Sequence, residues 1–167
     1  MFVKLNFINK DIISKVTGSY IKSNLSLDLK LTYEGSLKSS LSSTINKNLT
    51  IARDSFFLSF GELILTFNEN NLLESIDGYS NIDNWKKEII LEPSTSSSGA
   101  LSIDVDDKDD DRFSYEVDPI YYFDKNNSIL KIIISNEDEL IYKVSDNIFI
   151  GLLKNKKTSI IIKNLVM

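Results

Sequence analysis

Acidic side chains are concentrated in one short stretch of the sequence, residues 104–118. This stretch holds eight carboxylates against two basic residues, a net charge of −6, whereas the whole chain of 167 residues carries −5. Carboxylates this close together repel one another, so such a run persists as a solvated loop or in contact with a cation or a basic surface. The candidate partner-binding acids are Asp104, Asp106, Asp107, Asp109, Asp110, Asp111 and Glu116.

Three interpretations of this acidic stretch are open. A solvated loop at residues 104–112 would keep the protein in solution and shield an edge strand. A Ca²⁺ loop would use the alternate spacing of Asp107, Asp109 and Asp111. However, Arg112 takes the place of the glycine in such a loop and Asp118 that of its bidentate glutamate, so we expect no metal site. The third interpretation is a docking surface that steers a basic macromolecule toward its carboxylates.

Aromatic residues flank the acidic stretch and could anchor a partner. Tyr115, Tyr121 and Tyr122 follow its densest part, and Trp85 precedes it. A tyrosine buries a large ring at an interface while its hydroxyl stays hydrogen-bonded. Core packing is the alternative role for each. Tyr121 and Tyr122 are adjacent, so in a strand their rings point to opposite faces and one of them could face a partner.

The residue types argue against an enzyme. The chain has no histidine and no cysteine, which removes the usual general base, thiolate nucleophiles and disulfides. A pair of carboxylates could still do glycosidase-type chemistry, but no spacing singles out a pair among Glu62, Glu74, Glu88 and Glu116. The glycines form no phosphate-binding loop. We therefore expect no catalytic residue, no cofactor and no small-molecule substrate.

The patterning predicts a mainly β fold, with α+β as the other possibility. Residues 25–33 alternate strictly between leucine or tyrosine and polar residues, which indicates a half-buried strand. Further strands are expected at 2–8, 51–60, 62–68, 72–76 and 85–91; residues 12–20 are ambiguous, and 36–48 could form a short helix.

From residue 119 onward, short Asn-, Asp- or Lys-rich turns separate apolar runs, which predicts a continuous antiparallel meander. The architecture would be a sandwich or a half-barrel with one or two short helices. The apolar runs 132–134 and 160–162 indicate central strands covered on both sides.

The chain has the length and composition of one domain, residues 1–167. Residues 93–99 lack large apolar side chains and read as a flexible loop within it. The N-terminal residues do not resemble a signal peptide, and no apolar run is long enough to span a bilayer. We expect a cytoplasmic protein with no membrane partner. A sequence pI near 4.8 argues against direct nucleic-acid binding.

The chain resembles bacterial immunity proteins, particularly those of contact-dependent growth inhibition systems. The resemblance lies in a small, acidic, β-rich chain that combines the acidic stretch with aromatic residues between Leu101 and Tyr122. It implies that the protein binds the C-terminal domain of a cognate toxin, often a basic nuclease, and blocks its active site stoichiometrically. Acidic side chains would take the place of the substrate's phosphates.

An alternative function of another class is a β-sandwich carbohydrate-binding or adhesin-like module. In that case Trp85 and the tyrosines would stack on sugar rings. The missing export signal argues against this alternative.

Overall fold

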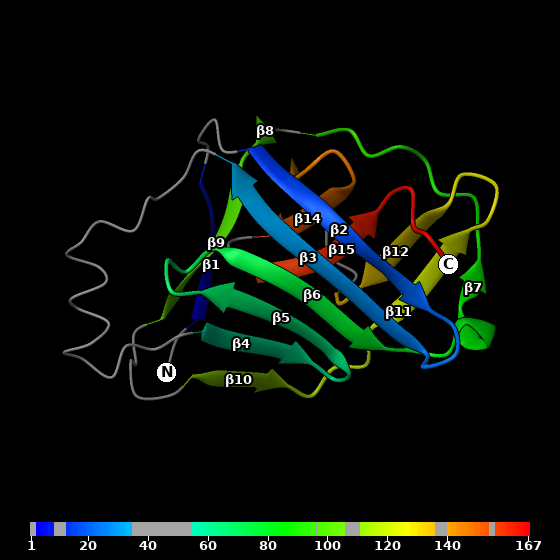
Figure 1. The fold of residues 1–167 in the computed structure, drawn as a ribbon, viewed down its shortest axis with the longest axis horizontal. Coiled ribbons are helices and arrows are strands. Elements are labelled where there is room, and N and C mark those ends of the chain that lie inside the picture. Colours follow the sequence, from blue (N-terminus) through cyan, green and yellow to red (C-terminus); the bar gives the residue numbers. More distant parts are fainter. Residues whose placement is uncertain are drawn as a thin grey trace.

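Two β-sheets face one another and enclose most of the apolar side chains between them (Figure 1). The computed structural model describes residues 3–8, 13–34, 55–95, 97–105, 111–135, 140–153 and 156–167. Strands make up most of this part, and its one helix is a 3₁₀ turn, η1 (Ile82–Asn84). The prediction of a mainly β fold is confirmed, in the form of a sandwich.

The first sheet has six strands and forms the front layer in Figure 1. From one edge to the other its strands are β10 (Arg112–Tyr115), β4 (Ser55–Phe60), β5 (Leu63–Asn68), β6 (Leu73–Tyr79), β3 (Ser26–Glu34) and β2 (Ile13–Ile21). All neighbours are antiparallel except β10, which runs parallel to β4. The ambiguous residues 12–20 thus contribute the edge strand β2.

The alternation in β3 fixes which face of this sheet is buried. Leu27, Leu29 and Leu31 are each 3% exposed, while Asp28 and Lys30 between them point to the opposite, outer face. Gly18 of β2 pairs with Leu29 at φ +129°, and a Cβ there would lie 2.0 Å from the carbonyl oxygen of Asp28. The close approach of the two strands therefore requires glycine.

The second sheet has seven strands and forms the rear layer. In order they are β7 (Lys86–Lys87), β11 (Ile120–Asp124), β12 (Ile129–Ile133), β15 (Lys156–Ile162), β14 (Ile148–Leu153), β13 (Leu140–Lys143) and β8 (Ser97–Ser98). The two edge strands, β7 and β8, are short and run parallel to their neighbours. Through β8, part of the expected loop at 93–99 pairs with the sheet.

A separate pair of antiparallel strands, β1 (Val3–Ile8) and β9 (Ala100–Val105), lies at one end of the sandwich. Leu5, Leu101 and Ile103 of this pair belong to the main core. Phe7 stacks on Tyr142 of β13 with ring centroids 4.5 Å apart. The pair therefore closes the space between the sheets at this end.

The strand order corrects the prediction of a continuous meander. The three expected hairpins are all present, but β12 pairs with β15 instead of with β13. A short connection permits pairing of its two strands without requiring it, and here the strand richest in buried isoleucine takes the centre. Ile160, Ile161 and Ile162 are at most 3% exposed, whereas Leu140 of β13 is 60% exposed. The expected central position of 132–134 and 160–162 is confirmed for β12 and β15, and a second buried cluster lies on their outer side.

Residues 85–91 do not form the strand we predicted. Only Lys86 and Lys87 form strand pairs with β11; the Glu88 N–H still donates to the Phe123 carbonyl at 3.4 Å, and Ile90 then packs in the second buried cluster. The reason is a side chain: Asp124 accepts a hydrogen bond from the Ile90 N–H at 3.1 Å, in place of a strand's backbone partner. The predicted helix at 36–48 lies outside the described residues.

Candidate functional site

The described acids of the stretch 104–118 lie at the surface. Asp104 is exposed in β9, and Asp111 and Glu116 are exposed immediately before and after β10. Asp106, Asp107, Asp109 and Asp110 lie outside the described residues. The stretch thus reaches the open edge of the six-stranded sheet at β10.

The β10 edge holds Tyr115 in a fixed position. Its ring stacks on Phe60 with centroids 5.3 Å apart and planes 9° from parallel, yet the residue is 40% exposed. The Arg112 guanidinium lies 5.5 Å from the centre of the Phe57 ring. Stacking restricts the rotamers of these side chains, so a partner that contacts Tyr115 meets a surface that is already ordered.

Tyr121 and Tyr122 lie elsewhere, on β11 in the second sheet. Tyr121 is partly buried between the sheets and stacks on Trp85 at 5.8 Å. Its hydroxyl is buried and makes no hydrogen bond of good geometry with a described residue. Burial, with the nearby Glu62 carboxylate, raises the pKa of Tyr121 to about 12, against the lowering effect of the Ser80 side chain. Tyr122 faces the other side, where the Lys86 ammonium lies 5.3 Å from its ring centre. Tyr121 and Tyr122 are therefore not part of the surface at the β10 edge, where Tyr115 and Glu116 lie.

Trp85 is a core residue. It is 5% exposed, with Tyr20 against one side and Tyr121 against another. Its indole N–H donates a hydrogen bond to the Ser80 hydroxyl at 2.9 Å. A ring covered in this way is not available to stack on a sugar, so the geometry does not favour the carbohydrate-binding alternative.

The outer face of the six-stranded sheet carries an acidic pair that we did not select from the sequence. Asp28 of β3 and Asp77 of β6 are direct cross-strand partners. Like charges in this arrangement destabilise a sheet. Asp77 accepts a hydrogen bond from the Ser75 hydroxyl at 2.5 Å. Burial raises the pKa of Asp77 and the Asp28 carboxylate raises it further, against the lowering effects of the Ser75 hydrogen bond and of Lys30.

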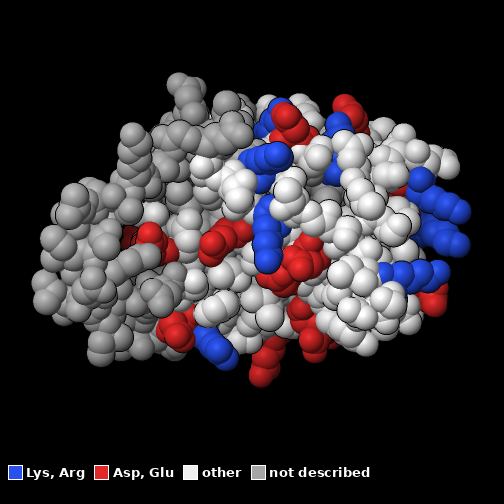
Figure 2. Space-filling model, viewed as in Figure 1, with Lys and Arg blue, Asp and Glu red and all other residues white. Residues whose placement is uncertain are grey.

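Two exposed apolar side chains lie beside this pair. Tyr79 on β6 is 55% exposed and Ile64 on β5 is 39% exposed. Figure 2 shows acidic side chains over the middle of this side of the molecule with basic ones between them, and a further group of basic side chains at the right-hand end. We define the acidic face as Asp28 and Asp77 together with the two described carboxylates that flank β10, Asp111 and Glu116. The basic residues among them are Lys15, Lys30 and Arg112.

The alternation of residues 25–33 placed Asp28 on a solvent-exposed face. Its partner could not be found the same way, because the pairing of β3 with β6 joins residues about fifty positions apart in the sequence. A single sequence gives no register for such a pair.

Comparisons with known proteins leave the class of this chain open. No protein-family model matches it, and no curated protein is significantly similar to it. In the part of the chain that the structure describes, no three or more His, Cys, Asp or Glu side chains are grouped closely enough to hold a metal ion. Within those same residues no helix has the length and apolar character needed to cross a membrane.

Proposed function

We propose that this protein is an inhibitory binding protein of the toxin-immunity type. It binds a basic toxin domain on the acidic face and blocks that domain's active site stoichiometrically. The observation that carries the proposal is the acidic pair, Asp28 and Asp77, whose mutual repulsion Lys30 only partly offsets, on an outer sheet face that no other described strand or helix covers.

The acidic pair supports the proposal because its repulsion is relieved by an added cation. Two carboxylates held side by side can accept hydrogen bonds from one lysine or arginine of a partner. Lys30, the nearest basic residue that acts on Asp77, does not cancel the effect of burial on its pKa. A basic partner would supply the missing charge.

The exposed rings and the sheet itself support a protein partner in particular. Tyr79 and Tyr115 offer aromatic contact area on or beside the acidic face. Anchors of this type contribute most when the contacts around them exclude water. The sheet keeps them at fixed separations, so little conformational entropy is lost on binding.

The test is a titration of toxin activity. The toxin is the C-terminal domain of a long secreted protein whose reading frame would lie immediately upstream. We expect its activity to fall linearly to zero at one equivalent of this protein. Activity that persists beyond one equivalent of a correctly folded sample, or turnover of a substrate by this protein alone, would contradict the proposal.

A charge-reversal variant locates the surface. The double substitution Asp28→Lys and Asp77→Lys should weaken inhibition by about a hundredfold or more, because it places two cations against a basic partner. The matched control is Asp83→Lys with Glu88→Lys, two exposed acids away from the acidic face, which should inhibit like the unmodified protein. Equal loss in both variants would show that only net charge matters.

A further inference from the structure

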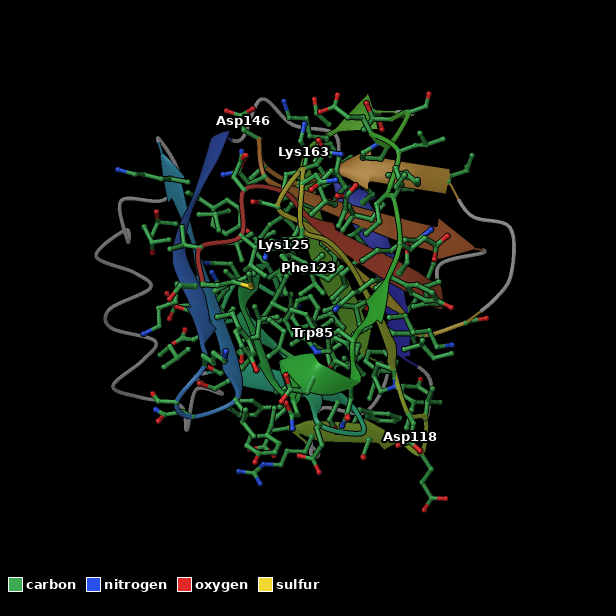
Figure 3. All side chains as sticks on the ribbon, turned by 90° about the vertical axis from the view of Figure 1, so that its right-hand side faces the viewer. Trp85, Asp118, Phe123, Lys125, Asp146 and Lys163 are labelled. Atoms are coloured by element: carbon green, nitrogen blue, oxygen red, sulfur yellow. The ribbon has the colours of Figure 1, made fainter. Side chains whose placement is uncertain are left out.

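A cleft of about 710 Å³ opens at the end of the sandwich that faces the viewer in Figure 3. Its walls come from the β2–β3 turn, from η1 and the segment after it, from the β11–β12 turn and from Met167. Trp85 and Phe123 lie at its inner side, and Lys125 stands beside them (Figure 3). The acidic face does not include any of these residues.

Two aliphatic side chains at this end are strongly exposed. Ile89, which lines the cleft, is 76% exposed, and Leu91 is 83% exposed. Ile90 between them is 8% exposed, and its N–H is held by Asp124. Because Ile90 is buried, the extended chain must point Ile89 and Leu91 outward.

Asp124 makes this arrangement rigid. Its carboxylate also accepts hydrogen bonds from the Asn126 and Asn127 N–H groups and from the Asn127 side-chain amide, at 2.9–3.2 Å. These bonds, the Asn127 amide first, hold the pKa of Asp124 below its usual value, so the anchor stays ionised at neutral pH. Ile89 and Leu91 therefore stay in water in the isolated protein.

Lysines surround these aliphatic side chains. Lys22, Lys87 and Lys125 line the cleft and Lys86 is adjacent; all four are exposed. None of the four forms an ion pair with another described residue. Three carboxylates lie among them, the exposed Asp83 and Glu88 and the buried Asp124, so the four lysines exceed the acids by one charge. We call this group of lysines, with Ile89 and Leu91, the basic end.

We infer that the basic end docks on the surface of an anionic lipid bilayer. Lysines would contact the headgroups while Ile89 and Leu91 insert at the boundary with the acyl chains. A small soluble anion could bind the lysines but would leave both aliphatic side chains in water.

This inference does not rest on the proposed function, and it departs from our expectation of no membrane partner. Toxin binding uses the outer face of the first sheet, whereas the bilayer would contact one end of the sandwich. A bilayer-bound molecule would still present its acidic face. The two proposals can therefore fail separately.

The test is sedimentation of the full chain with vesicles. We expect binding to vesicles of phosphatidylcholine with about 30% phosphatidylserine, and little binding to phosphatidylcholine alone. Ile89→Ser with Leu91→Ser should weaken binding about tenfold or more, because the inserted apolar groups are lost. Lys87→Glu with Lys125→Glu should weaken it similarly and reduce its dependence on salt.

Two controls make the result decisive. Leu140→Ser removes a 60% exposed leucine on β13, outside the basic end, and should bind vesicles normally. Circular dichroism checks that each variant is folded. Failure of the unmodified protein to bind phosphatidylserine vesicles at low salt would overturn the inference. So would full binding by the Ile89/Leu91 variant, or complete competition by millimolar inorganic phosphate at constant ionic strength, which would indicate a soluble anion instead.

Discussion

At the scale of single residues, Asp77 combines a cost to folding with a role in the proposed binding surface. Its pKa is raised in the folded state, so its contribution to stability is fully present below the unfolded value of 3.8 and is lost as the pH rises through the folded pKa. At neutral pH the ionised side chain therefore works against the fold. This is the behaviour expected of a charge retained for a partner.

We predict that Asp77→Asn stabilises the isolated protein at pH 7 by about 0.5 kcal/mol, the usual size of a cross-strand charge effect. The amide still accepts the Ser75 hydrogen bond but no longer repels Asp28. Urea unfolding at pH 7 and below pH 4 measures it: the difference from the unmodified protein should shrink at the lower pH. A destabilised variant at pH 7 would contradict the account of this pair.

Tyr121 and Tyr20 form a matched pair of buried hydroxyls. The Tyr20 hydroxyl donates to the Ser80 carbonyl at 2.8 Å and accepts from the Ile82 N–H at 3.2 Å. The Tyr121 hydroxyl lies near the Ser80 side chain but makes no hydrogen bond of this geometry with any described residue. We predict that Tyr121→Phe leaves the free energy of unfolding unchanged or raises it by up to about 1 kcal/mol. Tyr20→Phe should lower it by about 1–2 kcal/mol.

Chemical denaturation of the two variants compares them directly. High pH gives an independent check, because Tyr121 must be neutral in the folded state and ionises near pH 10 when unfolded. Stability of the unmodified protein should therefore fall between about pH 10 and 12 more steeply than that of Tyr121→Phe. An equal loss in the two Phe variants at pH 7 would show that Tyr121 has a partner.

At the scale of elements, the segment after Trp85 depends on one side chain for its position. Asp124 accepts the Ile90 N–H in addition to closing its own β11–β12 turn. We predict that Asp124→Ala releases residues 88–91: their amide protons exchange faster, and the fluorescence of Trp85, the single tryptophan, shifts to the red.

The control is Asp146→Ala in the β13–β14 turn. Asp146 is 93% exposed and pairs with Lys143, and a surface ion pair of this kind contributes little to stability. Its loss should change neither the exchange rates nor the fluorescence. Because the pKa of Asp124 is lowered, its contribution to stability is lost as the pH falls through the folded value. The free energy of unfolding of Asp124→Ala should therefore fall less than that of the unmodified protein as the pH is lowered.

The elements also show how far the sequence predicts the fold. Strands with strict alternation, such as β3, and hairpins with polar turns were identified correctly because both signals are local. The strand order β12–β15–β14–β13 was not predicted, because it depends on which strands bury the most apolar surface when the whole sheet assembles. The prediction of a strand at residues 85–91 was wrong because the Ile90 N–H donates to the carboxylate of Asp124, 34 positions further along the chain, instead of to a neighbouring strand.

The candidate site was predictable to a similar degree. The acidic stretch and Tyr115 could be selected by composition, and the described members lie at the surface. The pair of Asp28 and Asp77 could not be predicted from the sequence, since only the register between β3 and β6 makes these two residues neighbours. For Trp85 and Tyr121 the residue type suggested contact with a partner. Both side chains instead pack between the two sheets.

At the scale of the whole molecule, charge is distributed unevenly between two surfaces. Carboxylates, with a few basic side chains between them, lie over the outer face and the β10 edge of the first sheet, and a group of lysines lies at one end (Figure 2). Both surfaces are built on ordered strands and turns. A basic partner of the kind we propose would be oriented toward the acidic face by this uneven distribution of charge.

The most direct test of the proposed function is the salt dependence of the affinity for the basic toxin domain. We predict that raising salt from about 50 mM to about 500 mM weakens the complex of the unmodified protein at least tenfold, mainly by slowing association. Asp28→Lys with Asp77→Lys should bind more weakly at low salt and show a much flatter dependence. If that variant instead binds as tightly as the unmodified protein with the same salt dependence, the acidic face is not the binding surface.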